Sequence, residues 1–137
     1  MDTNVLIYSR DLDAAAKRVR SIEVIEGLPG RGELSLSAQC LNEFSAVMLR
    51  RGLSIQQVAT AVARWCDLAE VLPLTGAATA VALRAVAQRH LSFWEALIWA
   101  VAREAGVPVI VSEDFQDGRE LEGVQFLNPF LRSRLSD

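Results

Sequence analysis

The sequence of 137 residues predicts an α/β fold, with a central, mainly parallel sheet flanked by helices. Short apolar runs, of which Val107–Val111 is the clearest, alternate with segments whose apolar residues recur at helical spacing. Hydrophobic residues make up 51% and charged residues 23% of the chain, the proportions of a packed globular protein. Its length suits one apolar core, so we expect residues 1–137 to form a single domain.

The first elements follow from helical periodicity and from turn residues. Helices are expected at Thr3–Arg10 and Asp13–Gly27, the second with Asp13 as its N-cap. Gly27–Gly32 (GLPGRG) is expected to be a loop, because glycine and proline interrupt regular structure. Leu34–Ser37 then reads as a short strand.

The middle of the chain alternates in the same way. Ala38–Arg51 has an apolar helical face and ends at Gly52. Ser54 is expected to cap a helix that runs to about residue 69, with Gln57 completing a capping box. Glu70–Leu74 reads as a strand that carries Val71 and Leu72.

The last third repeats helices and strands. Thr75–Gln88 is an alanine-rich helix, and Ser92 begins another that ends at Gly106. Val107–Val111 is expected to be a buried strand, followed by the turn-rich Glu113–Gly118 and a last strand at Val124–Leu127. In such sheets ligands bind beyond the carboxyl ends of the strands.

Composition excludes several chemistries. The net charge of −3 argues against a strongly basic nucleic-acid coat protein. Any histidine-dependent triad would have to use His90, the single histidine. Cys40 and Cys66 are expected to be reduced core thiols, and no zinc cluster is indicated. We expect no signal peptide and no membrane span, and therefore a cytoplasmic protein.

Two candidate acids lie in the first half of the chain, one at the start of a predicted helix and one within a predicted helix. Asp2 precedes Thr3 and Asn4, and its alternative role is that of a helix cap. Glu43 lies within an amphipathic helix, and its alternative is a surface glutamate that pairs with Arg50 or with a neighbouring helix.

Two further acids lie in the second half. Glu95 is the only charged residue in the run 93–102, so its carboxylate should point inward or into a cleft. It then needs a metal, a proton or a structural arginine. Asp114 lies just past the carboxyl end of the buried strand, at the expected mouth of a site, although turn capping is an alternative for it.

Together these four acids indicate a metal site. Several carboxylates in one cleft repel each other, and a divalent cation removes that penalty. Oxygen ligands without histidine or cysteine suit Mg²⁺ or Mn²⁺. Such a cation can activate water for in-line attack on a phosphodiester, so the residues predict metal-assisted phosphoryl chemistry.

Five blocks of sequence, in this order and spacing, resemble the PIN-domain family and most closely its VapC-type toxins. They are MDTNVLIY (1–8), LNEF (41–44), LSFWEALI (91–98), VSEDFQDG (111–118) and NPF (128–130). The resemblance implies a three-layer αβα PIN-like fold and a ribonuclease that needs Mg²⁺ or Mn²⁺.

The resemblance also implies roles for residues. The family's acidic quartet corresponds to Asp2, Glu43, Glu95 and Asp114, which would hold the metal and act in catalysis. The implied supporting residues are Thr3, Asn4, Ser112 and, as an outer acid, Asp117. The implied partners are structured RNA such as tRNA or rRNA, a small VapB-like antitoxin that binds operator DNA, and a second copy of the chain in a homodimer.

The chain departs from the family pattern at two places. Glu95 stands where the family usually has Asp, and the extra methylene can move a metal ligand. Only Met1 precedes Asp2, so we expect the family's first strand to be almost absent here. These departures support an alternative, a catalytically weakened PIN-like module that binds antitoxin or RNA without turnover.

Other candidate roles are weaker. An aspartyl-phosphate phosphohydrolase would need a second acid where Asn4 stands. Candidate RNA contacts are Arg10, Arg18 and Arg119, with a solvated helix face as the alternative. Trp94 and Trp99 are expected to lie in the core or in a dimer interface rather than to stack on bases. His90 is expected to end its helix near the last carbonyl groups.

Overall fold

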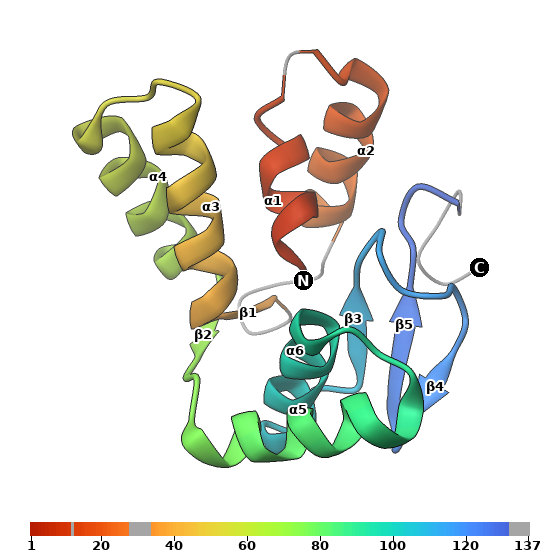
Figure 1. Ribbon diagram of the computed structural model, residues 1–137. Coiled ribbons are helices and arrows are strands. Elements are labelled where there is room, and N and C mark those ends of the chain that lie inside the picture. The colour runs from red at the N-terminus through yellow and green to blue at the C-terminus, as the bar shows by residue number, and fades with distance from the viewer. Residues whose placement is uncertain (12, 28–33, 132–137) are drawn as a thin grey trace.

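The computed structural model describes residues 1–11, 13–27 and 34–131. Within them the chain forms six helices and five strands, which are arranged as shown in Figure 1. The predicted loop Gly27–Gly32 lies outside the described residues from residue 28 onward. The helices are α1 (Thr3–Tyr8), α2 (Ala15–Glu26), α3 (Ala38–Arg50), α4 (Ile55–Leu68), α5 (Gly76–Arg89) and α6 (Phe93–Glu104). The strands are β1 (Ser35–Ser37), β2 (Glu70–Leu72), β3 (Val109–Val111), β4 (Glu120–Leu121) and β5 (Val124–Leu127).

The strands form two small sheets joined by the N-terminal residues. β1 and β2 pair in parallel, and in the other sheet β5 pairs in parallel with β3 and antiparallel with β4. The Asp2 N–H donates to the Val111 carbonyl at the end of β3 (2.9 Å), and the Met1 nitrogen donates to the Ser35 carbonyl in β1 (3.0 Å). Residues 1 and 2 thus bridge the sheets without forming a strand themselves.

The side chains of β3 show that helices cover both faces of the sheet. Ile110 packs in a core with α5, α6, β4 and β5, whereas Val109 and Val111 pack on the opposite face with Val5 of α1 and Val24 of α2. Successive strand residues point to opposite faces, so β3 lies between two helical layers. The protein therefore has the predicted three-layer αβα architecture with parallel pairing at its centre.

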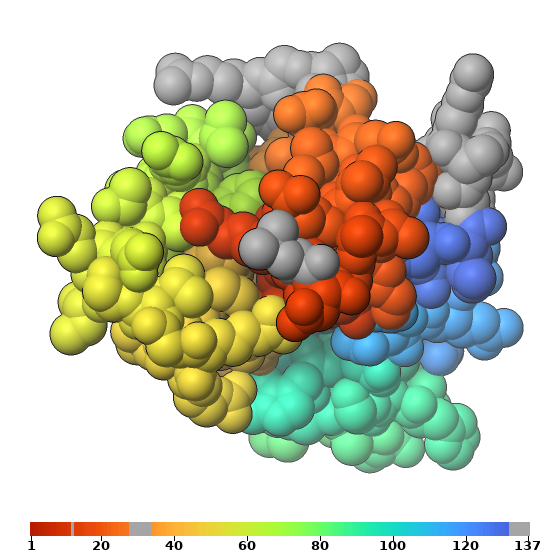
Figure 2. All heavy atoms as spheres, turned by 90° about the horizontal axis from the view of Figure 1, so that it is seen from above, coloured from red at the N-terminus to blue at the C-terminus, as the bar shows by residue number. Residues whose placement is uncertain are grey.

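A second large core joins α1, β1, α3 and α4. Phe44 is fully buried there and meets Trp65 edge to face, with ring centroids 6.4 Å apart. In the space-filling view from above, α1 and α2 lie between α3–α4 on one side and the blue C-terminal strand region on the other (Figure 2).

The start of α2 differs from the prediction for a local reason. Ala14, not Asp13, is the N-cap of α2, because the Asp13 N–H is held by the Asp11 carboxylate (3.0 Å) and no side chain caps the helix. Cys40 is buried as expected, but Cys66 is exposed on the outer face of α4. The Ser54–Gln57 capping box of α4 is confirmed.

β4 was not predicted at all. It has only two residues, too few to show periodicity, and a two-residue turn at Glu122 and Gly123 connects it to β5. Both turn residues have positive φ angles (47° and 82°), as hairpin turns of the primed types require. Glu at the first of these positions is not a recognisable turn signal, so the hairpin could not be found from the sequence.

Replacement of Phe44 by alanine tests the position of the second core. Phe44→Ala is expected to lower the free energy of unfolding by about 3–5 kcal/mol, because it removes a ring that packing fully encloses. Urea unfolding followed by circular dichroism measures this change. Leu49→Ala, on the exposed face of the same helix, is the control and should change stability by less than about 1 kcal/mol. Equal effects of the two substitutions would contradict the packing described.

Candidate active site

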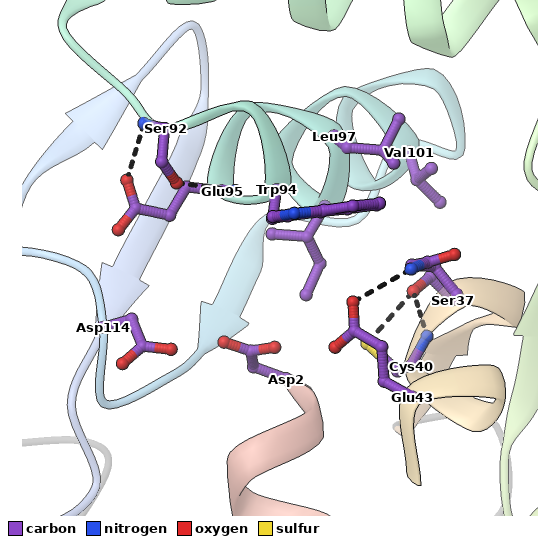
Figure 3. A pocket seen from close by; sticks show the side chains of 12 residues that line it. Asp2, Ser37, Cys40, Glu43, Ser92, Trp94, Glu95, Leu97, Val101 and Asp114 are labelled. Carbon is purple, nitrogen blue, oxygen red and sulfur yellow. Dashed lines mark hydrogen bonds between the residues drawn. The ribbon is translucent and has the colours of Figure 1, made fainter. Parts of the chain in front are cut away.

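A cleft of about 280 Å³ opens at the carboxyl ends of β1 and β3 and brings the four predicted acids together. Asp2, Glu43, Glu95 and Asp114 line it from α1, α3, α6 and the segment after β3. Figure 3 shows the four side chains around the cleft, with the carboxylate of Glu95 turned toward Ser92. This is the edge of the sheet where an α/β protein is expected to bind its ligand.

Three helices also begin at this cleft. Asp2, Ser37 and Ser92 are the N-caps of α1, α3 and α6, and all three line it. The N-terminus of a helix carries partial positive charge from unpaired N–H groups and the aligned peptide dipoles. The cleft therefore combines several carboxylates with a backbone field that offsets part of their mutual repulsion.

Asp2 has the most constrained carboxylate of the four. One oxygen accepts a hydrogen bond from the Thr3 N–H (2.7 Å), so the helix-cap role is confirmed. The other oxygen accepts a hydrogen bond from the hydroxyl of Ser112, which is itself buried (2.6 Å). Asp2 thus acts as a cap and also lines the cleft, so the two roles considered for it are compatible.

Glu43 is held by neighbouring side chains. The Thr3 hydroxyl donates to one carboxylate oxygen (2.8 Å) and the Gln39 amide donates to the other (2.9 Å). The alternative of a surface glutamate paired with Arg50 does not describe this arrangement. Thr3 therefore supports the site through its hydroxyl by orienting Glu43, rather than by pointing into the cleft itself.

Glu95 has a structural role that sequence reasoning missed. Its carboxylate accepts a hydrogen bond from the Ser92 N–H (3.0 Å), while the Ser92 hydroxyl accepts one from the Glu95 N–H (3.3 Å). This is a complete capping box at the start of α6. The signal was visible as Ser followed by Glu three residues later, the same pattern that identified the start of α4.

Asp114 is the most exposed of the four acids. Its carboxylate accepts a hydrogen bond from the Asn4 amide (3.2 Å), and its backbone N–H donates to the Ser112 hydroxyl (3.1 Å). Ser112 therefore links Asp2 and Asp114, and Asn4 links α1 to the segment after β3. The predicted supporting residues Thr3, Asn4 and Ser112 all contact an acid of the quartet.

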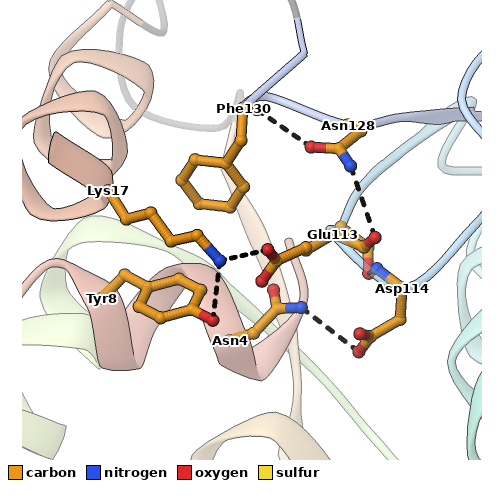
Figure 4. Close-up of polar contacts among 8 residues, drawn as sticks. Asn4, Tyr8, Lys17, Glu113, Asp114, Asn128 and Phe130 are labelled. Atoms are coloured by element: carbon orange, nitrogen blue, oxygen red, sulfur yellow. Dashed lines mark hydrogen bonds and ion pairs between the residues drawn. The ribbon is translucent and has the colours of Figure 1, made fainter. Parts of the chain in front are cut away.

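The segment that carries Asp114 is anchored from the other side as well. Glu113 forms an ion pair with Lys17 of α2, whose ammonium group also donates to the Tyr8 hydroxyl and lies over the Tyr8 ring (Figure 4). Asp117 accepts a hydrogen bond from the Asn128 N–H (2.9 Å) and does not line the cleft. These contacts fix the backbone on both sides of Asp114.

The pKa values of Asp2 and Asp114 are raised by burial and by neighbouring charges. Burial raises the pKa of Asp2, and the nearby charge of Glu43 adds to this increase. Burial also raises the pKa of Asp114, with further increases from the charges of Asp2, Glu113 and Glu95. Each effect disfavours the ionised carboxylate, and a bound cation would favour it again.

The chemistry of the donors fits a hard divalent cation, because the cleft presents carboxylate oxygens and no imidazole. Within residues 1–11, 13–27 and 34–131, however, no three acidic, histidine or cysteine side chains are already gathered closely enough to hold a metal. The carboxylates instead bond to Thr3, Ser92, Ser112 and other neighbours. Cys40 also lines the cleft, but burial raises the pKa of its thiol, which disfavours a thiolate nucleophile.

The predicted RNA-contacting arginines lie away from this cleft. Arg10 lines a separate hollow with Ser54 and Arg64, and Arg119 donates to the Arg89 carbonyl at the end of α5 (3.0 Å). Arg18 belongs to α2. His90 ends α5 as its C-cap in the left-handed conformation (φ 55°), as the sequence indicated.

The two tryptophans of α6 differ in environment. Trp99 is buried and its indole N–H donates to the Leu121 carbonyl (3.1 Å), as expected of a core residue. Trp94 does not lie in the core: its exposed fraction is 60%, and it lines the cleft beside the acids. Position in the first turn of the helix, outside the packed interior turns, accounts for the difference.

These features define an αβα domain with an acidic cleft at the carboxyl ends of its parallel strands, a site suited to divalent cations. The model of the PIN domain family matches residues 1–116, and the chain belongs to this family. PIN domains are in general metal-dependent nucleases. A search of curated proteins found no significant match to the chain. In the described residues, no helix is long and apolar enough to cross a membrane.

Removal of one charge from the cleft is expected to stabilise the metal-free protein. Because the folded pKa values of Asp2 and Asp114 are raised, their stabilising contribution is complete below their unfolded values, about pH 4, and is lost as pH rises through the folded values. At pH 7 in EDTA, Asp114→Asn should therefore unfold at a temperature equal to or above that of the wild type. Differential scanning fluorimetry measures both proteins.

Addition of Mg²⁺ or Mn²⁺ provides the second arm of this experiment. The cation should raise the unfolding temperature of the wild type, because it binds the folded state, and should raise that of Asp114→Asn much less. A wild type indifferent to either cation would contradict a metal-binding role for the cleft.

The capping role of Glu95 can be separated from its charge. A glutamine side chain can accept the same hydrogen bond from the Ser92 N–H, so Glu95→Gln is expected to keep the stability of the wild type. Glu95→Ala removes the cap and should lower the free energy of unfolding by about 0.3–1.5 kcal/mol. Chemical denaturation of the three proteins measures this difference, and equal stability of Glu95→Ala and wild type would show that the capping box contributes nothing.

Proposed function

We propose that this PIN domain is a Mg²⁺- or Mn²⁺-dependent endoribonuclease that hydrolyses RNA phosphodiesters, with tRNA or rRNA as its substrate class. The observation that carries the proposal is the convergence of Asp2, Glu43, Glu95 and Asp114 from four separate elements on one cleft. Helix capping accounts for Asp2 and Glu95 individually. It does not account for Glu43 and Asp114 at the same cleft, where burial and the charges of neighbouring acids raise the pKa of Asp114.

In this proposal the carboxylates of the quartet hold the cation, and the residues around them fix their positions. A divalent cation in the cleft would lower the pKa of a bound water and stabilise the leaving oxygen of a phosphodiester. Ser112 orients Asp2, Thr3 orients Glu43, and Asn4 orients Asp114, each through a direct hydrogen bond. Asp117 acts at a distance, by holding the backbone of Asn128.

The biological setting we propose is a type II toxin–antitoxin pair. Cleavage of tRNA or rRNA would inhibit translation, and a VapB-like antitoxin would mask the cleft and contact operator DNA. The toxin would act in the cytoplasm as a homodimer, with residues 1–137 as a single domain. Arg10, Arg18 and Arg119 remain candidate RNA contacts at a distance from the cleft. This setting rests on the resemblance of the sequence blocks to VapC-type toxins.

A second candidate is a PIN-like module that binds antitoxin or RNA without turnover. The hydrogen bond between the Glu95 carboxylate and the Ser92 N–H favours it, because this bond turns the carboxylate toward the start of α6 and uses one of its two oxygens. The two candidates differ in one property, which is cleavage that depends on a divalent cation.

Cleavage of total RNA by the purified, antitoxin-free protein tests the proposed function. We expect discrete fragments with Mg²⁺ or Mn²⁺ and none with EDTA, and Asp114→Asn should lower the rate by about 100-fold or more, since it removes a group at the reacting centre. Glu70→Gln, which neutralises an exposed carboxylate on β2 outside the cleft, is the matched control and should cleave like the wild type. Absence of cleavage by folded wild-type protein would support the binding module instead.

A further inference from the structure

We propose that Trp94 is a base-stacking residue, which holds the nucleobase beside the phosphodiester in the cleft and so selects RNA that is unstacked at that position. This inference rests on the proposed ribonuclease function and adds to it a substrate feature and a positioning residue.

Trp94 is the exposed one of the three tryptophans. Its exposed fraction is 60%, against 8% for Trp65 and 3% for Trp99. The buried residues of α6 are alanine, leucine, tryptophan and valine side chains that all follow Trp94 in the helix, so the helix contributes to the core without it. Single exposed apolar side chains are common on protein surfaces, and what distinguishes this ring is its position at the rim of the acidic cleft.

Trp94 lies where the cleft continues into a second depression. It lines both the acidic cleft and an adjoining groove of about 460 Å³, and Asp2, Glu43 and Asp114 also line both. The two depressions therefore meet at the acids and at Trp94. A phosphodiester placed at the acids would lead its neighbouring nucleoside along the ring of Trp94 into the groove.

The ring is oriented to receive a planar group. Figure 3 shows the indole edge-on, with Asp2 and Glu43 on the side of one of its faces. Phe93 meets Trp94 in an edge-type contact, with centroids 5.1 Å apart and planes at 63°, which restricts the ring without stacking on it. One indole face is therefore turned toward the cleft.

The walls of the groove suit a nucleotide. Ile7, Ala46 and Val47 provide an apolar side for a base or ribose, and Arg50 provides a cation at the same groove for the next phosphate. The volume falls within the range of small-ligand pockets. A nucleotide would use the apolar wall, the Arg50 guanidinium and, with the cation of the proposed nuclease bound at the carboxylates, a place for its phosphate. An apolar peptide would use the wall alone, so RNA is the occupant that the groove favours.

Stacking on Trp94 has a consequence for the substrate. A base inside a helical stack has both faces covered, so a tryptophan can stack only on a base that has left the stack, as in a loop or a single strand. The geometry thus selects loops and single strands over the interior of duplex stems, without selecting a particular base.

Binding of short oligonucleotides tests the proposal. Asp114→Asn protein, which is expected not to cleave, is titrated in the presence of Mg²⁺ while tryptophan emission is recorded. The ligands are hexaadenylate and a series of hexamers of the same sequence in which each position in turn is abasic. Trp65 and Trp99 are buried and provide a constant background, so stacking should quench the emission of Trp94 selectively. The same titrations, followed by anisotropy of a labelled hexamer, are run on proteins that also carry Trp94→Ala or Trp94→Phe.

The expected result has three parts. Hexaadenylate quenches the parent protein, Trp94→Ala weakens binding by about 5- to 100-fold, and Trp94→Phe retains most of the affinity because it keeps a stacking face. At its most sensitive position, the abasic site should weaken binding to the parent but not to the Trp94→Ala protein. Trp94 is exposed, so these variants should unfold at nearly the wild-type temperature.

The proposal is overturned if hexaadenylate binds Trp94→Ala as tightly as the parent, or if the abasic penalty is the same in both. Either result would leave contact with a protein partner as the role of the exposed ring. The proposed nuclease activity fails separately: if wild type cleaves no RNA but Trp94 is quenched, stacking stands and turnover does not. If RNA is cleaved and Trp94→Ala changes neither KM nor binding, only the stacking proposal is lost.

Discussion

The position of Asp2 determines how the rest of the site is assembled. Its N–H joins the start of α1 to the last residue of β3, and its carboxylate accepts hydrogen bonds from the first turn of α1 and from Ser112. Because β1–β2 and β3–β5–β4 are separate sheets, residues 1 and 2 connect them through their backbone donors. Each neighbouring acid is then placed relative to this junction: Glu43 through Thr3, and Asp114 through Ser112.

The arrangement has an electrostatic cost. Burial raises the pKa of Asp2, and Asp114 is affected both by burial and by the other acids. Three helix N-termini offset part of this cost, and a bound cation would offset more. Glu95 affects both helix stability and the charge of the cleft. Its carboxylate completes the cap of α6, and its charge raises the pKa of Asp114. Helix capping accounts for two of the four acids, but a need for stability alone would not bring Glu43 and Asp114 to the same cleft.

The sequence was informative where a physical signal was local. Ser54 and Gln57 indicated a capping box, and the apolar run Val107–Val111 indicated a buried strand. Asp114, which follows that run, lies at the expected edge of the sheet. Local signals failed where a contact joins residues far apart in the sequence, or where an element is too short to show periodicity. Trp94 resembled its buried neighbours because periodicity does not show which turn of a helix extends beyond the core. The Lys17–Glu113 ion pair joins residues 96 positions apart, and the two-residue β4 has no period.

In the proposed nuclease the four carboxylates form one metal site. A crystal structure of the protein soaked in Mn²⁺, with anomalous diffraction data collected near the manganese absorption edge, tests it most directly. We expect an anomalous peak in the cleft from a manganese ion that binds carboxylate oxygens, including those of Asp2 and Asp114. A map without a peak there at saturating Mn²⁺, or with peaks only elsewhere on the surface, would contradict it.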